Sequence, residues 1–387
     1  MNVEIRPTVL TGTVEAPPSK SYAHRLLLAA ALSDRECKIE NISSSDDVSA
    51  TLDCVDTLKR GGEYYNCRES GSTMRFFVPL SLVKGDKAEF RGSERLMERG
   101  ISEYEAVFAG KGITIEKKPT AMILRGKLSP GEYTLRGDVS SQFVSGLLLA
   151  LPLLEGESRI TVLPPVESRG YIDITLDVLR KFGISVFERE KNTFLVPGGQ
   201  KYCGTDSTIE GDWSNAAFFC ALSEMGVKLK ITGLNENSLQ SDRRCVEFFK
   251  ALKNSAAEIE LSDNPDLAPL LMAFAALHHG GTLTGTRRLA LKESDRAAAM
   301  AEELRKFGAK IEINNNKVNI IKMELHTPTE TLASHNDHRI VMALTLLCLR
   351  FGGTILGAEA VKKSWPEFFD VLRSLGTDIS YNQGNTA

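Results

Sequence analysis

The strongest constraint on the fold is a nearly uniformly apolar stretch of helical length, which recurs six times along the chain. Each stretch begins beside Ser, Asp or Asn, residues that cap the free backbone N–H groups of a helix. A helix that is apolar on all sides has to be buried. The pattern therefore predicts buried helices that begin at Ser21, Ser72, Ser141, Trp213, Asp266 and Asp337.

The segments between these helices complete a repeated unit. Strand-like stretches such as residues 87–93 and 281–286 follow the apolar helices, and amphipathic helices that stop at Gly come next, as in residues 174–183 and 297–308. Six units in 387 residues favour two domains of three units, with the switch between them near Ser207–Gly211. Buried helices and outer sheets differ from a Rossmann layout, and no G-x-G-x-x-G follows a strand. The sequence thus predicts an α/β fold.

Charge and cysteine usage narrow the function classes. The chain carries 47 Lys and Arg against 50 Asp and Glu, and this slightly acidic balance argues against a general nucleic-acid binder. Seven cysteines without a C-x-x-C pair argue against a disulfide framework or a structural zinc site and favour a reducing compartment. No apolar run reaches the ~18 residues of a membrane span. We therefore expect a cytoplasmic protein without a membrane partner.

Polar residues gather where the apolar helices begin, and helix N-termini suit phosphate and carboxylate ligands. In residues 17–25, Lys20, Ser21 and Arg25 surround one helix start. Cations at a helix N-terminus oppose the helix dipole, so an anionic ligand explains them better than solvent does. In residues 137–143 capping explains one Ser, but it does not explain Ser140, Ser141 and Gln142 together.

Other candidates have a plain alternative that the sequence leaves open. The turn at Gly71 could be only a capped turn, Arg99 could be a surface charge, and Asp266 could cap its helix or act as a base. His335 and His338 lack an evident third ligand, so we expect no metal site. The candidate cations are Lys20, Arg25, Arg75, Arg99, Lys292, Arg296, Arg339 and Lys363.

This set of cations fits substrates with several negative charges. Asp266 and Glu293 are carboxylates that could move protons among them. No Walker A loop and no nucleophile elbow is present. The residues themselves predict a two-domain enzyme that acts on phosphorylated and carboxylated small molecules.

Eight motifs together resemble the 5-enolpyruvylshikimate-3-phosphate synthase family of enolpyruvyl transferases. They occur in the family's order between residues 17 and 369, and they are PPSKSYAHRLLLAAAL, ESGSTMRF, VSSQF, SRGYIDIT, NPDLAPLL, LKESDR, NDHRIVMAL and KSWPEFF. The resemblance implies an inverse α/β barrel, with two similar domains of three βαβαββ-type units that close on substrate. We expect the first domain at residues 14–208 and the second at residues 1–13 plus 209–387.

The resemblance also implies roles for individual residues in transfer of the carboxyvinyl group of phosphoenolpyruvate to the 5-hydroxyl of shikimate-3-phosphate. Those that would bind shikimate-3-phosphate are Ser21, Arg25, Ser140, Ser141, Gln142, Ser168, Tyr171, Asp266 and Lys292. Those that would bind phosphoenolpyruvate are Lys20, Gly71, Arg75, Arg99, Gln142, Arg296, Arg339 and Lys363.

In this family scheme Lys20 and Glu293 would manage the methylene proton, and Asp266 would take the proton of the 5-hydroxyl. Addition would give a tetrahedral ketal phosphate, and elimination would release phosphate. The resemblance implies a monomer of chorismate biosynthesis that needs no cofactor or metal. It also implies that glyphosate competes with phosphoenolpyruvate.

The sequence departs from the family pattern at Glu69, where many members have Asn, at Arg288, where some have Asn as a substrate contact, and at Gly170, where some have Pro. The first two affect peripheral contacts and leave the reaction itself in place.

Two other functions stay open at this point. The sister transferase that acts on UDP-N-acetylglucosamine usually carries Asn after its first Lys and a loop with a reactive Cys. Here Ser21 follows Lys20, and residues 92–103 contain no Cys. The other possibility is a relative that only binds anions or that processes RNA ends. The set of Lys20, Asp266 and Glu293 argues against mere anion binding, and the acidic net charge argues against RNA processing.

Overall fold

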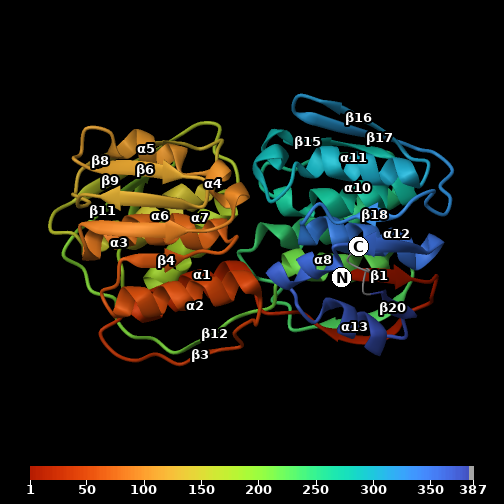
Figure 1. The fold of residues 1–387 in the computed structure, drawn as a ribbon, viewed down its shortest axis with the longest axis horizontal. Helices are drawn as coiled ribbons and strands as arrows, with labels where there is room; N and C mark the ends of the chain where they lie inside the picture. Colours follow the sequence, from red (N-terminus) through yellow and green to blue (C-terminus); the bar gives the residue numbers. More distant parts are fainter. Residues whose placement is uncertain (383–387) are drawn as a thin grey trace. The chain divides into compact units, whose positions relative to one another are not determined.

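The computed structural model describes residues 1–382 and divides the chain into two compact units. Unit 2 is one continuous segment, Pro18–Glu210, and unit 1 combines Met1–Pro17 with the chain from Gly211 onward. The N-terminal segment thus joins the C-terminal half, and in unit 1 the red strand β1 (Asn2–Ile5) pairs with the blue strand β20 (Ile379–Asn382) (Figure 1).

Unit 2 contains seven α-helices, one 3-10 turn and three sheets among its described residues. The helices are α1 (Lys20–Leu32), α2 (Asp46–Lys59), α3 (Gly71–Lys84), α4 (Glu94–Arg99), α5 (Ser102–Phe108), α6 (Ser141–Ala150) and α7 (Arg169–Lys181), and η1 (Leu151–Leu153) follows α6. One sheet has the order β4 (Tyr64–Asn66), β5 (Lys87–Arg91), β7 (Ala121–Arg125), β6 (Thr114–Lys118). A second has the order β10 (Phe187–Glu190), β11 (Thr193–Val196), β9 (Ser158–Leu163), β8 (Glu132–Arg136), and β12 (Ser207–Thr208) pairs with β3 (Ile39–Glu40).

Unit 1 has the same kind of arrangement. Its helices are α8 (Trp213–Glu224), α9 (Cys245–Asn254), α10 (Ala268–Leu277), α11 (Arg296–Lys306), α12 (His338–Phe351) and α13 (Phe368–Ser374). Its 3-10 turns are η2 (Ser241–Arg244), η3 (Pro265–Leu267), η4 (Arg287–Leu291) and η5 (Ala358–Lys363). Its sheets have the orders β18 (Leu332–Ala333), β19 (Gly353–Leu356), β1, β20, then β14 (Glu258–Glu260), β15 (Gly281–Thr284), β17 (Lys317–Ile321), β16 (Lys310–Asn314), and β13 (Lys228–Thr232) with β2 (Thr11–Glu15).

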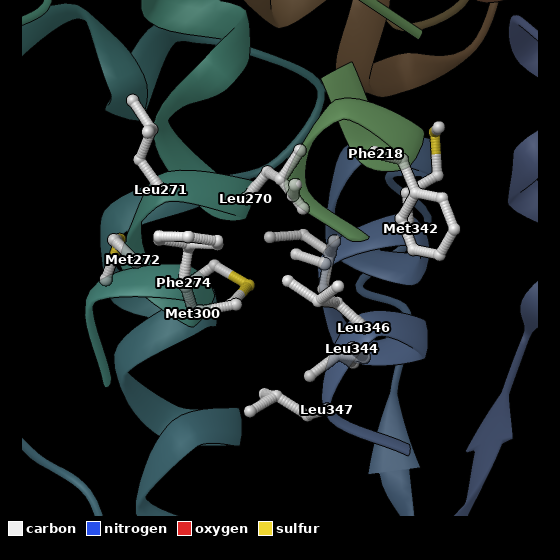
Figure 2. Packing of buried hydrophobic residues seen from close by; sticks show 14 of the residues in the cluster. Phe218, Leu270, Leu271, Met272, Phe274, Met300, Met342, Leu344, Leu346 and Leu347 are labelled. Atoms are coloured by element: carbon white, nitrogen blue, oxygen red, sulfur yellow. The ribbon is translucent and has the colours of Figure 1, made fainter. Parts of the chain in front are cut away.

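The predicted apolar helices are buried helices. Every residue of α10 is buried, as are the first twelve residues of α12 from His338 to Leu349. In the core of unit 1, Leu270 and Phe274 of α10 meet Met300 of α11 and Leu346 of α12 (Figure 2). Truncating such a residue to Ala costs about 2–5 kcal/mol, so this packing contributes strongly to the stability of unit 1.

The sheets cover these helices with alternating side chains. In β5, Ala88 and Phe90 are buried, whereas Arg91 is exposed. Antiparallel pairing with β7 sets Phe90 opposite Met122, which is also buried. This period-two alternation is what a strand with one face on the core requires. In residues 1–382 no helix is both long and apolar enough to cross a membrane.

Candidate functional site

In unit 2 the first helix start holds an ion pair. Ser19 caps α1, and Nζ of Lys20, in the first turn, lies 2.7 Å from Oδ2 of Asp47. Both side chains are largely buried, with 17% and 12% of their surface exposed. Asp47 is a residue that the sequence analysis missed; its only sequence signal is its place at the polar start of α2.

Arg25 is a buried cation whose contacts are with neutral oxygens. Only 2% of it is exposed, and it donates to Thr175 Oγ1 at 2.7 Å, to Ser145 Oγ at 3.2 Å and to the carbonyls of Ser21 and Tyr171 at 2.7 and 3.0 Å. Burial lowers the pKa of this guanidinium to about 10, which still leaves it charged at neutral pH. A buried charge is costly unless an opposite charge compensates it, so this place suits an anion.

A second group joins the starts of α3 and α6. Arg75 Nη1 donates to Gln142 Oε1 at 2.6 Å, and Gln142 Nε2 donates to Ser72 Oγ at 2.8 Å. Arg75 Nη2 donates to the carbonyl of Arg99 at 3.3 Å. A Cβ atom on Gly71 would lie 3.1 Å from Nη2 of Arg99. The structure therefore brings two guanidinium groups to the N-terminus of α3, an arrangement that favours an anionic ligand.

The remaining candidates of unit 2 lie at the starts of α6 and α7. Ser140 caps α6 by accepting from the backbone N–H of Gln142 at 3.3 Å, and Ser141 is the first residue of that helix. Ser168 precedes α7 in a left-handed conformation (φ 58°) and is buried. Tyr171 follows in the first turn, where its carbonyl accepts from Arg25 at 3.0 Å.

In unit 1 a single guanidinium connects three carboxylates. Arg296, which is 1% exposed, donates Nε to Asp337 Oδ2 at 2.9 Å, Nη1 to Asp266 Oδ1 at 2.6 Å and Nη2 to Glu293 Oε2 at 2.9 Å. Lys292 Nζ lies 3.1 Å from the same Asp266 oxygen. Bonds between charged groups are the strong ones, and together they fix the orientation of all three carboxylates.

Electrostatics keeps Asp266 ionised. Burial by itself would raise the pKa of this carboxyl, but nearby cations, first Lys292 and then Arg296, outweigh burial and hold the pKa well below its usual value. Burial lowers the pKa of the Lys292 ammonium against the opposing effect of Asp266. Asp266 is thus in the protonation state that can accept a proton.

Two further buried cations lie in unit 1. Arg339 is 6% exposed and donates to Ser214 O at 2.8 Å, Ser214 Oγ at 2.8 Å and Asn215 Oδ1 at 3.0 Å, all neutral oxygens. Its Nε is buried, with no hydrogen-bond partner among the described residues. Lys363 is 8% exposed, and its Nζ donates to the carbonyl of Asn336 at 2.5 Å. Like Arg25, Arg339 directs its hydrogen bonds to neutral oxygens, an arrangement that suits an anionic ligand.

The structure shifts one predicted helix start. The helix expected from Asp266 begins at Ala268, whereas Asp266 itself lies in η3 and its side chain pairs with Lys292 and Arg296. Arg99 is the last residue of α4, and Lys363 is the last residue of η5. These elements are too short to give a periodic signal.

Asp337 and His335 have partners in the structure that the sequence did not indicate. The sequence marked Asp337 as a helix start, and it does cap α12 by accepting from Arg339 N at 2.9 Å, but it also pairs with Arg296. His335 Nε2 lies 2.9 Å from Glu303 Oε1, a partner that the sequence did not suggest.

Comparison with known proteins identifies the family. The chain matches the family model described as EPSP synthase (3-phosphoshikimate 1-carboxyvinyltransferase) over residues 5–65, 60–253 and 248–372. It is 37% identical to the 3-phosphoshikimate 1-carboxyvinyltransferase of Clostridium kluyveri, over 97% of this chain and 98% of that protein. The protein of the same name from Clostridium acetobutylicum is also 37% identical, with the same coverage.

Solved structures agree on the fold. An EPSP synthase from Acinetobacter baumannii superposes with a TM-score of 0.78 at 22% identity, covering 99% of this chain and 100% of that one. The enolpyruvyl transferase NikO from Streptomyces tendae superposes with a TM-score of 0.76 at 14% identity, covering 98% of both chains. At these identities the likeness concerns the fold, and it confirms the predicted α/β architecture. With the family model and the full-length relatives, it follows that the chain belongs to the EPSP synthase family.

Proposed function

We infer that this enzyme transfers the carboxyvinyl group of phosphoenolpyruvate to the 5-hydroxyl of shikimate-3-phosphate and releases phosphate, as a step of chorismate and aromatic amino-acid biosynthesis. The relatives that cover the whole chain are named for this reaction. The observation that carries the inference is the pair of buried guanidinium groups of Arg25 and Arg339, whose hydrogen bonds go to neutral oxygens. Both substrates are polyanions, and they supply the charge that these side chains need.

Shikimate-3-phosphate, the acceptor, would bind at the helix starts of unit 2 that carry hydroxyl groups. Arg25 and Ser141 would bind the phosphate and ring oxygens of shikimate-3-phosphate, with Ser21, Ser140, Gln142, Ser168 and Tyr171 around them. In unit 1, Asp266 and Lys292 would contact the ring hydroxyls of the same substrate. Asp266 is ionised and accepts the proton of the 5-hydroxyl as that oxygen attacks C2 of phosphoenolpyruvate.

Phosphoenolpyruvate would bind to the guanidinium and ammonium groups. We assign Gly71, Arg75, Arg99 and Gln142 of unit 2, together with Lys20, to its binding. In unit 1 the corresponding residues are Arg296, Arg339 and Lys363. Their fixed positive charges stabilise negative charge that shifts toward the leaving phosphate, a form of catalysis that needs no reorganisation during the reaction.

Lys20 and Glu293 handle the proton at the methylene carbon. In the addition step C3 gains a proton and the 5-oxygen bonds to C2, which gives a tetrahedral ketal phosphate. In the elimination step the C2–O bond to phosphate breaks and C3 returns a proton, which restores the double bond. Glu293 is held 2.9 Å from Arg296 and Lys20 is held 2.7 Å from Asp47, so both groups are oriented before substrate binds.

Phosphate release with different acceptors tests this function. The purified enzyme should release phosphate from phosphoenolpyruvate with shikimate-3-phosphate and not with UDP-N-acetylglucosamine. Release with the nucleotide sugar alone would assign the sister reaction. Binding of both substrates without release would leave only an anion-binding role.

We further propose that the enzyme works as a monomer in the cytoplasm. All seven cysteines are free thiols, five of them buried, as expected in a reducing compartment. Light scattering at working concentration should give a mass near 42.5 kDa, and twice that mass would contradict the monomer.

A further inference from the structure

The carboxylate of Glu303 connects α11 to a neighbouring segment of unit 1. Glu303 is fully buried and lies seven residues, or about two turns, after Arg296. Its Oε1 lies 2.9 Å from His335 Nε2, and its Oε2 accepts from the backbone N–H of Ala333 at 2.9 Å. Lys306 Nζ lies 3.0 and 2.9 Å from the two oxygens. A buried carboxylate with this many partners ties together the elements that supply them.

The segment that Glu303 contacts has an unfavourable backbone. His335 and Asn336 are consecutive residues with φ of 49° and 53°, in the left-handed region. This conformation costs roughly 1–2 kcal/mol per residue for most side chains, although Asn tolerates it better. It persists only where the surroundings enforce it. Glu303 thus bonds to Ala333, two residues before the strained turn, and to His335 within it.

The strained turn presents two groups to the cations that we assign to phosphoenolpyruvate. The carbonyl of Asn336 accepts from Lys363. The next residue, Asp337, pairs with Arg296 and caps α12 at the backbone N–H of Arg339. The charged groups of Lys363 and Arg296 therefore contact two consecutive residues, and Arg339 contacts the second of them through its backbone N–H.

We propose that Glu303 and His335 are positioning residues, which set the affinity for phosphoenolpyruvate by holding Asn336 and Asp337 in place. The proposal rests on the function proposed above. Glu303 and His335 contact no group assigned to shikimate-3-phosphate directly and reach Asp266 only through Asp337 and Arg296, so their larger effect should fall on phosphoenolpyruvate.

A cation site is the other reading of this cluster, because Glu302, Glu303 and His335 bring three potential ligand atoms within 4.8 Å. The ammonium of Lys306 already lies against both oxygens of Glu303 and would repel a metal ion. The pKa of His335 is raised, chiefly by its hydrogen bond to Glu303, with Glu302 and Lys306 as the other charged groups that act on it. The arrangement is that of a hydrogen-bonded ion pair.

The test uses His335→Asn. Asn tolerates the left-handed backbone but is too short to reach Glu303, so the substitution removes the contact and keeps the turn. We expect the KM for phosphoenolpyruvate to rise about tenfold, which corresponds to about 1.4 kcal/mol. The KM for shikimate-3-phosphate should stay within about twofold. His279→Asn is the matched control, since His279 is exposed in the same unit, and both of its KM values should match the parent.

Two further variants separate positioning from general destabilisation. His335→Gln keeps an N–H donor at the end of a longer side chain and should recover most of the affinity. Glu303→Gln, combined with His335→Asn, should raise KM for phosphoenolpyruvate by less than the product of the two single effects, because both remove one contact.

Each result decides the proposal. A parent enzyme that releases no phosphate would overturn the proposed function and this proposal with it. An active parent with an unchanged KM in His335→Asn would overturn positioning alone. Equal increases in both KM values, with a lower melting temperature and no recovery by His335→Gln, would show a merely structural role.

Discussion

Replacing Glu293 by Gln separates its chemical role from its structural one. The carboxylate lies 2.9 Å from Arg296 Nη2, and 18% of the side chain is exposed. An amide oxygen can still accept this bond, and Arg296 keeps Asp337 and Asp266 as partners. We therefore expect the free energy of unfolding to fall by only about 1 kcal/mol. For a domain of 150–250 residues this lowers the melting temperature by roughly 2–4 °C.

The effect on turnover should be much larger. An amide cannot exchange a proton with the methylene carbon, and loss of a general acid or base typically lowers kcat by at least ~100-fold, or about 2.7 kcal/mol of barrier. Phosphate release gives kcat, and calorimetry should show shikimate-3-phosphate binding within a few fold of the parent. Glu312→Gln is the matched control, because Glu312 is exposed on β16.

Two results would contradict a chemical role for Glu293. Near-normal turnover in Glu293→Gln would remove Glu293 from the proton transfer. A fall in turnover accompanied by a loss of more than ~10 °C in melting temperature would mean that the carboxylate serves mainly to compensate Arg296.

Three further predictions concern other contacts. Gly71→Ala places a methyl group 3.1 Å from the end of the Arg99 side chain, which has to move by a few tenths of an ångström. Because overpacking in a filled site costs roughly 1–3 kcal/mol, the inhibition constant for glyphosate should rise more than the KM for phosphoenolpyruvate, and equal rises would contradict a steric effect. Asp337→Asn removes one of three carboxylates from a buried guanidinium and should cost about 2–3 kcal/mol, seen as a melting temperature roughly 5–10 °C lower; an unchanged melting curve would contradict the pairing. His335→Asn should lower the melting temperature more at pH 5.5 than at pH 9. A histidine with a raised pKa contributes its full stabilisation below about pH 6.5 and loses it as the pH rises through the raised pKa. An equal loss at both pH values would show that the ion pair with Glu303 does not stabilise the fold.

The buried helices could be predicted because two independent signals coincide at their starts. Asp212 caps α8 immediately before the expected first residue Trp213, and Asp337, the expected first residue of α12, is the cap of that helix. A cap followed by an apolar run is a local feature, and it is therefore visible in the sequence. The same reasoning was less accurate for Asp266, which lies in the three-residue η3 before α10, because so short an element gives no periodic pattern.

The partners of the candidate residues could not be predicted. Lys20 pairs with Asp47, 27 residues away, and Arg296 pairs with Asp337, 41 residues away. Such pairs depend on how helices pack against one another, which no local pattern encodes. The sequence showed where cations gather, but only the structure shows that Arg296 holds three carboxylates and that Arg339 contacts neutral oxygens.

The transfer by addition and elimination is tested most directly by running the reaction in deuterium oxide and examining the product by mass spectrometry and proton NMR. Addition followed by elimination passes through a methyl group at C3, so one solvent deuteron can remain when a proton is returned. We expect a carboxyvinyl product on shikimate-3-phosphate that carries deuterium at its methylene carbon, and we expect the Glu293→Gln variant to form this product at least ~100-fold more slowly. A product formed at the parent rate without deuterium would contradict the addition–elimination mechanism, and no carboxyvinyl product would contradict the proposed function.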